Sequence, residues 1–145
     1  MASPLYTAAA TVTGGRAEGH GRSSDGMLDL QLRLPTEMGG NGEGTNPEQL
    51  FAIGFAACFE GAMGVIGRRE RAEVGSVSID SRVSLITNES RGFTLAVALD
   101  VTLPDVDDPE LAQRIVAGAH KVCPYSNATR GNIDVTLTAN GQEVV

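Results

Sequence analysis

The sequence of 145 residues contains no tryptophan, and aromatic residues make up only 4% of it. Because 41% of the residues are hydrophobic, a core is still expected, built mainly from Leu, Val, Ile and Ala. Basic residues are also scarce: 11 Lys and Arg stand against 18 Asp and Glu, which gives a formal net charge of −7. Proteins that bind nucleic acid or an anionic membrane surface need a basic patch. We therefore expect neither nucleic acid nor a membrane among the partners of this protein.

The sequence also lacks a recognisable secretory signal and is poor in cysteine. Residues 1–13 have neither the basic nor the apolar segment of such a signal, so we expect a cytoplasmic protein. The length fits a single domain over residues 1–145. The only two cysteines are Cys58 and Cys123. In the reducing cytoplasm, such cysteines are more often free, catalytic or redox-active than joined in a structural disulfide.

A long helix is predicted from residue 46 to the basic sequence at residues 68–71. Asn46 is a favourable N-cap, and Pro47 suits the first helical position because it has no backbone N–H to leave unpaired. Glu48 adds a negative charge to the first turn, where the helix dipole favours one. Gln49 completes a variant of the capping box. Together these residues predict where the helix begins.

The predicted helix is almost entirely apolar. Glu60 is the only charge between residues 50 and 67, so we expect the helix to be buried on nearly all sides. Its length also fits a short membrane span, but the central charge and four glycines favour a buried helix of a soluble protein. Small residues recur along it, either for close packing in the core or for contact with a helix of a second subunit: Gly54, Ala57, Gly61 and Gly64.

Alternating apolar and polar residues predict strands on both sides of this helix. Residues 5–13 and 27–34 precede it, with a loose glycine-rich segment between them. The loop at residues 35–45 lacks the Lys-Ser/Thr pair of a phosphate-binding loop, so we interpret it as a flexible lead-in to the helix. The last strands are apolar on one face only, which predicts antiparallel strands laid over helices in an α+β fold. The remaining predicted elements are strands at 77–85, 93–103 and 133–138, a hairpin loop at 88–92 and a helix at 108–123.

The residues by themselves leave the chemistry open. A free cysteine is most often a small buried core residue, and Cys58 fits this interpretation because it lies among Ala and Phe in the apolar helix. Cys123 looks more reactive, since it precedes Pro124 at a helix end and follows His120 by three residues. On these local grounds Cys123 is the first choice of nucleophile. His120 either orients the turn at Cys123 or lies on the helix surface, and His20 is expected in a solvated loop.

Two longer motifs around these cysteines resemble a known family. Residues 46–59 read NPEQLFAIGFAACF, and residues 120–132 read HKVCPYSNATRGN. In this order and at this separation, they resemble the first and second cysteine motifs of the organic hydroperoxide resistance (Ohr) branch of the OsmC/Ohr superfamily. The resemblance covers nearly the whole chain, because shorter segments also fit at residues 14–16, 24–26 and 28–30.

This resemblance implies a cysteine-based peroxidase that reduces organic hydroperoxides to alcohols. Cys58 would be the peroxidatic cysteine and would pass through a sulfenic acid to a disulfide with Cys123, the resolving cysteine. This assignment reverses the choice made on local grounds. Arg16 would stabilise the Cys58 thiolate, and Glu48 would hold Arg16 by a bidentate contact. Glu60 is an acidic departure from the expected pattern, although on a helix it points about 200° away from Cys58.

The resemblance also implies a fold and partners. It implies antiparallel sheets wrapped around a long buried central helix, an intertwined homodimer, and dihydrolipoamide or a lipoylated protein as the dithiol reductant. No cofactor is implied, and the two cysteines and two histidines lack a compact metal-binding spacing. Phe51, Phe55 and Phe59 would form apolar walls for the substrate, although core packing explains them equally well. The alternative function is a non-catalytic module that binds a small apolar ligand in its cleft.

Overall fold

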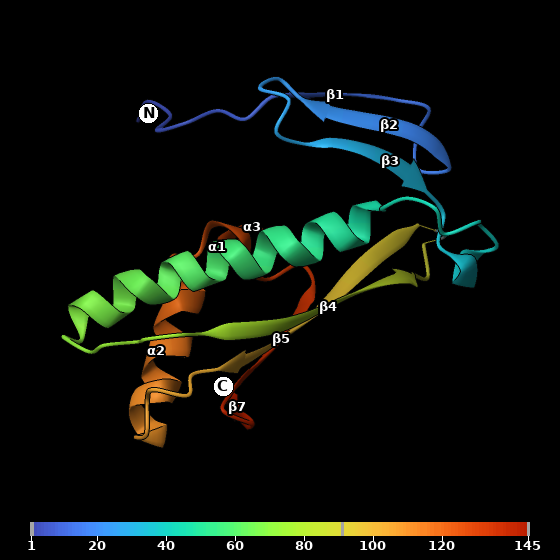
Figure 1. Cartoon of the computed structure of the whole chain (residues 1–145). Helices are drawn as coiled ribbons and strands as arrows, with labels where there is room; N and C mark the ends of the chain where they lie inside the picture. Colours follow the sequence, from blue (N-terminus) through green and yellow to red (C-terminus); the bar gives the residue numbers. More distant parts are fainter. Residues whose placement is uncertain (1, 91, 145) are drawn as a thin grey trace. The chain divides into compact units, whose positions relative to one another are not determined.

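The computed structural model describes residues 2–90 and 92–144 (Figure 1). It divides into two compact units between residues 50 and 51. The chain mixes helices and two sheets, as predicted, and the prediction of one domain stays a prediction. The elements are β1 (Ala10–Thr13), β2 (Glu18–Ser23), β3 (Asp29–Arg33), the 3₁₀ helix η1 (Thr36–Met38), α1 (Pro47–Arg69), β4 (Ser78–Thr87), β5 (Phe93–Thr102), α2 (Pro109–Val122), α3 (Pro124–Thr129), β6 (Asp134–Ala139) and β7 (Gln142–Val144).

The first unit contains a three-stranded antiparallel sheet in the order β1-β2-β3. The strands predicted at 5–13 and 27–34 are present as the shorter β1 and β3. The central strand β2 is a correction, because a loose segment was predicted there. Gly19 and Gly21 interrupt the alternation that marks a strand, yet Gly19 is needed: a Cβ there would lie 1.9 Å from the carbonyl oxygen of Gly15.

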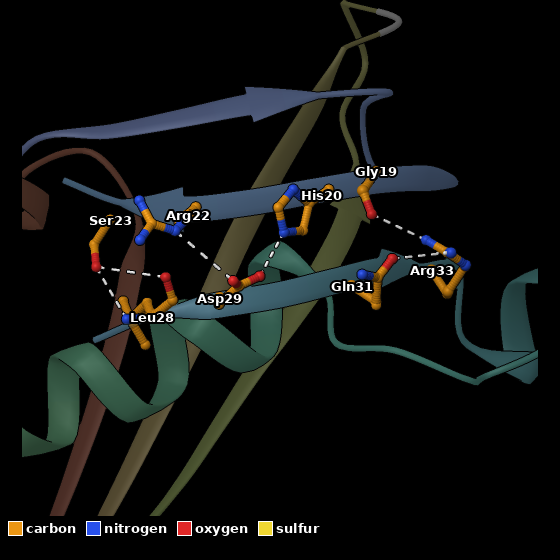
Figure 2. A network of polar contacts seen from close by, with 8 residues as sticks. All are labelled: Gly19, His20, Arg22, Ser23, Leu28, Asp29, Gln31 and Arg33. Atoms are coloured by element: carbon orange, nitrogen blue, oxygen red, sulfur yellow. Dashed lines mark hydrogen bonds and ion pairs between the residues drawn. The ribbon is translucent and has the colours of Figure 1, made fainter. Parts of the chain in front are cut away.

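Polar side chains connect β2 and β3, as Figure 2 shows. Nε2 of His20 lies 2.5 Å from Oδ1 of Asp29, and Nε of Arg22 lies 3.8 Å from Oδ2 of the same carboxylate. His20 therefore lies in a strand beside a carboxylate, and the prediction of a solvated loop was wrong. Because all three side chains are about half exposed, these contacts contribute little to stability.

The second unit contains a four-stranded sheet in the order β4-β5-β6-β7. Its odd-numbered apolar side chains pack with α1 and α2 into one core, which confirms the predicted one-faced strands. Most even-numbered positions of β4 and β6 are polar, and Asp100 of β5 accepts hydrogen bonds from Arg82 (2.7 Å) and Thr138 (2.9 Å). The fully buried core side chains include Phe55, Phe59, Met63, Leu99, Val101, Ile115 and Val116.

The connections in this unit follow the predictions in part. Asp108 caps α2 by accepting the backbone N–H of Glu110, as the Asp-Pro-Glu sequence predicts. In the hairpin between β4 and β5, the N–H of Asn88 donates to the carbonyl oxygen of Gly92. Arg91 of the predicted loop at 88–92 lies outside the described residues.

One strand pairing corrects the predicted antiparallel arrangement. β6 runs parallel to β5, whereas β4–β5 and β6–β7 are antiparallel. The cause is the connection, because α2 and α3 lie between β5 and β6, and a helical crossover allows parallel pairing. α3 and β7 were not predicted, since six and three residues are too few for a periodic pattern.

The long helix α1 is less buried than its composition predicts. Phe55, Phe59, Ala62, Met63 and Ile66 are buried in the core of the second unit, but other positions are exposed. Small residues explain part of the difference, because Ala and Gly raise the apolar fraction while offering little side-chain surface to bury, but the larger Leu50 and Ile53 are exposed as well. Among the described residues, α1 alone is long and apolar enough to cross a membrane, and 33% of its most apolar window is buried. Its contribution to the core favours the role of a core helix.

Candidate active site

Arg16 lies in the tight turn between β1 and β2. Gly14 and Gly15 have φ angles of 77° and 67°, a left-handed conformation that glycine adopts without strain. A Cβ at Gly14 would also lie 2.4 Å from the carbonyl oxygen of Glu18. The two glycines therefore let the chain reverse direction immediately before Arg16.

Glu48 is brought to the same sheet by the residues that lead into α1. Thr45 runs beside β3: its N–H donates to the carbonyl oxygen of Gln31 (2.8 Å), and its carbonyl oxygen accepts the N–H of Arg33 (2.9 Å). This pairing fixes the start of α1 against β3. Glu48 follows in the first helical turn, so its position in the first unit is set by the backbone.

The predicted N-cap of α1 is present, but the capping box is not. Oδ1 of Asn46 accepts the backbone N–H of Gln49 at 2.9 Å. The Gln49 side chain does not reach back to the backbone of Asn46, because its Oε1 accepts a hydrogen bond from the Thr45 hydroxyl at 2.8 Å. Asn46 itself is buried, which keeps this cap out of water.

Arg16 and Glu48 form the ion pair that was predicted. Nη1 of Arg16 donates to Oε1 of Glu48 at 2.9 Å and lies 3.4 Å from Oε2. One guanidinium nitrogen thus contacts both carboxylate oxygens, whereas the predicted bidentate contact uses two nitrogens. The Glu48 side chain is 15% exposed and that of Arg16 is 38% exposed. The carboxylate therefore holds Arg16 from a largely buried position.

In the second unit, Cys58 lies on α1 and Cys123 lies at the corner between α2 and α3. Both thiols are free; Cys58 is half-buried, and Cys123 is fully buried. Cys123 is both the C-cap of α2 and the N-cap of α3, with an extended backbone (φ −64°, ψ 125°). The fold brings these two thiols close enough to interact, because Cys123 is among the groups that raise the pKa of the Cys58 thiol.

The surroundings of Cys58 act on its ionisation in opposite directions. Burial raises the pKa of the Cys58 thiol above its ordinary value, and a hydrogen bond from the backbone N–H of Tyr125 lowers that pKa. The charge of Cys123 and a hydrogen bond with its side chain raise the pKa further. A raised pKa leaves less of the reactive thiolate at neutral pH. Cys58 would therefore need a further stabilising group to act as a nucleophile.

Tyr125 also builds an aromatic cluster beside the cysteines. Its ring centroid lies 5.7 Å from that of Phe51 and 5.6 Å from that of Phe55. Gly54 makes room for the phenol, because a Cβ at this position would lie 2.9 Å from Oη of Tyr125. Tyr125 is not among the predicted site residues, although its place two positions after Cys123 in the second motif is a signal for it.

An apolar cavity of about 470 Å³ borders this cluster. Phe51 is the one predicted wall residue that lines it, whereas Phe55 and Phe59 are fully buried in the core. The core-packing interpretation therefore fits Phe55 and Phe59. The lining residues are Phe51, Leu95, Pro124, Tyr125, Ala128, Thr129, Asn132 and Ile133.

The remaining candidate residues are placed as follows. Glu60 is exposed, in keeping with its predicted direction away from Cys58. His120 is partly buried and bonded to a side chain of α3, so the interpretation as a plain helix-surface residue was wrong. Within residues 2–90 and 92–144, no group of three His, Cys, Asp or Glu side chains could hold a metal ion.

Known proteins resemble this chain over nearly its full length. A family model described as OsmC-like protein matches residues 40–138. An organic hydroperoxide resistance protein of Xanthomonas axonopodis pv. citri is 57% identical in an alignment of 143 positions that covers 95% of this chain and 99% of that protein. The organic hydroperoxide resistance protein OhrB of Bacillus subtilis has a crystal structure with a TM-score of 0.84 at 47% identity, covering 92% of this chain and 98% of that one. The organic hydroperoxide resistance protein from Elizabethkingia anophelis gives a TM-score of 0.88 at 43% identity, with 94% and 97% covered.

Proposed function

We propose, because the chain belongs to the organic hydroperoxide resistance (Ohr) proteins of the OsmC-like family, that it reduces organic hydroperoxides to alcohols and protects against oxidative stress. The observation that carries this proposal is the interaction between Cys58 and Cys123, which lie far apart in the sequence. A peroxidase that resolves its own sulfenic acid needs two thiols in contact. A module that only binds an apolar ligand has no need of this contact.

In the first step of the proposed reaction, the Cys58 thiolate attacks one oxygen of the hydroperoxide. The O–O bond breaks, a bond forms between sulfur and the attacked oxygen, and the alkoxide takes up a proton and leaves as the alcohol. The sulfur loses two electrons, and the peroxide gains them. The backbone N–H of Tyr125 supports this step, because its hydrogen bond favours the thiolate over the thiol.

In the second step, the Cys123 thiol attacks the sulfur of the Cys58 sulfenic acid. A disulfide forms, and the hydroxyl group leaves as water with the proton of the Cys123 thiol. An external dithiol then reduces the disulfide by thiol–disulfide exchange. We propose dihydrolipoamide, free or carried on a lipoylated protein, as this dithiol.

Arg16 is proposed as the cation that Cys58 needs. A guanidinium beside a thiolate lowers the pKa of the thiol and offers N–H donors to the peroxide oxygen as charge develops on it. The ion pair between Arg16 and Glu48 supports this role, because the largely buried carboxylate restricts the guanidinium. Glu48 and Cys58 also belong to the same helix, α1.

The cavity beside Phe51 is proposed to receive the apolar tail of the hydroperoxide. Its walls are apolar, and Tyr125 at its edge is the residue whose backbone contacts Cys58. Phe51 would touch the substrate, while Phe55 packs edge-on behind it at a centroid distance of 5.9 Å. Phe59 would support the wall from the core.

We also propose a cytoplasmic homodimer. Ile53 on α1 is 70% exposed, and Ala57 and Gly61 on the same helix are exposed as well. A Cβ at Gly61 would meet no atom within 4 Å, so this side of α1 leaves room for close approach. An exposed row of small and apolar residues on a helix is typical of a surface that a second subunit covers.

The proposed function is tested directly with the purified protein. We expect the reduced protein to consume tert-butyl hydroperoxide continuously when dihydrolipoamide is supplied, and to stop after about one equivalent per chain without it. Mass spectrometry of the stopped protein should find a Cys58–Cys123 disulfide. Binding of an apolar dye in the cavity without any peroxide consumption would instead favour the non-catalytic module.

Replacement of Arg16 with alanine is expected to slow the reaction with hydroperoxide about a hundredfold at neutral pH, because one cation and its N–H donors are lost. The pKa of Cys58 should rise, so the rate should recover as the pH increases and the thiolate returns. Alkylation of Cys58 by iodoacetamide as a function of pH measures this change. Arg22→Ala is the matched control, since Arg22 is an exposed arginine of the same sheet. An unchanged titration in Arg16→Ala would remove Arg16 from the site.

A further inference from the structure

The corner that carries Cys123 is closed by a side-chain contact between the two helices that meet there. Nδ1 of His120, in the last turn of α2, lies 2.9 Å from Oγ of Ser126 in α3. Each residue is three positions from Cys123, so the contact spans the corner evenly. Ser126 is fully buried and His120 is partly buried, which makes this bond costly to lose.

Backbone hydrogen bonds hold the peptide groups of Cys123 at the same corner. Its N–H donates to the carbonyl oxygen of Ala119 (2.8 Å), and its carbonyl oxygen accepts the N–H of Asn127 (2.9 Å). The Cys123 side chain makes no capping bond to α3, so the sulfur stays available. These bonds hold the backbone of Cys123 where α2 and α3 meet, and the bond between His120 and Ser126 spans the same corner.

Arg130 adds a second contact across the corner. Its guanidinium donates to the carbonyl oxygen of His120 and to Oδ1 of Asn127. The His120 carbonyl is one of the last of α2, where no intrahelical N–H is left to pair with it. Burial, together with the charge of Arg130, lowers the pKa of His120. The imidazole is thus neutral at neutral pH and can accept the Ser126 hydroxyl at Nδ1.

We propose that His120 and Ser126 are positioning residues that hold Cys123 ready to attack the Cys58 sulfenic acid. This inference rests on the proposed function. It concerns the second step only, in which the Cys123 thiol forms the S–S bond and water leaves. A second hydroperoxide competes for the same sulfenic acid, adding an oxygen to give a sulfinic acid and releasing another alcohol. The orientation of Cys123 therefore decides how often the protein inactivates itself.

The test compares His120→Leu and Ser126→Ala with the unchanged protein during turnover with tert-butyl hydroperoxide and dihydrolipoamide. We expect the fraction of Cys58 converted to sulfinic acid per turnover, measured by mass, to rise about tenfold in both variants, because a misplaced thiol reacts more slowly. The rate of the first oxidation of Cys58 in a single turnover should stay within about twofold. His120→Asn, whose side-chain amide reaches the Nδ1 position, should restore most of the protection. Lys121→Leu changes an exposed neighbour and should have no effect.

A second measurement tests the positioning role without hydroperoxide. Diamide oxidises the two thiols to the disulfide and is itself reduced to the hydrazine, and this step should slow about tenfold in His120→Leu. If the unchanged protein forms the disulfide with diamide but consumes no hydroperoxide, the proposed function fails while the positioning of Cys123 stands. Equal disulfide rates and equal overoxidation in all variants would overturn the inference. Equal slowing of both reaction steps would also overturn it, because it would indicate a general loss of structure.

Discussion

Replacement of Cys58 with serine is expected to abolish hydroperoxide consumption. Serine is close to cysteine in size, but its hydroxyl is hardly ionised at neutral pH and forms no sulfenic acid. Removal of a nucleophile of this kind costs on the order of 10⁵-fold or more in rate, which leaves only the background reaction. The measurement is the loss of tert-butyl hydroperoxide over time with dihydrolipoamide in excess.

The companion variants make this result specific. Glu60→Gln alters an exposed residue of the same helix and should keep nearly full activity. The melting temperature of Cys58→Ser should stay near that of the unchanged protein, because Cys58 is only half-buried and the substitution removes little volume. Sustained turnover by Cys58→Ser, with none by Cys123→Ser, would restore the assignment of Cys123 as nucleophile that local sequence features favour.

The start of α1 was predictable from the sequence because its signals are local. Asn46 and Pro47 define a cap through contacts within a few residues, and the helix begins there. The burial of α1 was not predictable in the same way. The apolar composition of a helix indicates how much surface it could bury. The sheet and α2 determine which side is covered, and Ile53 remains exposed.

The errors in the strands have a related cause. β2 was missed because Gly19 and Gly21 carry no side chain that could alternate between apolar and polar. The parallel pairing of β5 with β6 was missed because the alternation of apolar and polar residues is the same for either strand direction. Only the path of α2 and α3 determines the direction of β6 relative to β5. Patterns within one strand therefore report which face is buried, but not the neighbour or its direction.

In the candidate site, too, the residues were predictable from local motifs, whereas their interactions depend on the fold. Cys58 and Cys123 were recognised from motifs, but the influence of Cys123 on the pKa of Cys58 is a property of the fold, as is the ion pair between Arg16 and Glu48. The hydrogen bond from the Tyr125 backbone could not be read from the sequence at all, because every residue except proline has an N–H and only its position gives it a role.

Replacement of Cys123 with serine is expected to convert the protein from a catalyst into a reagent. Cys58 should still reduce about one equivalent of hydroperoxide per chain, because the first step needs only its own thiolate. Without the resolving thiol, the sulfenic acid persists, and excess hydroperoxide should convert it to the sulfinic acid, which consumes a second equivalent more slowly. Steady-state consumption with dihydrolipoamide should therefore fall to near zero, and mass spectrometry should find two oxygen atoms added to Cys58.

This variant needs a second form because Cys123 is fully buried. A serine hydroxyl without a partner at such a position costs about 1–3 kcal/mol of stability, so Cys123→Ala should be measured beside it. Both variants should show the same fast first equivalent of consumption and the same slower overoxidation, since both lack the resolving sulfur. If both instead sustain full turnover with dihydrolipoamide, the dithiol must reduce Cys58 directly, and Cys123 would be a core residue that merely lies beside the reactive sulfur.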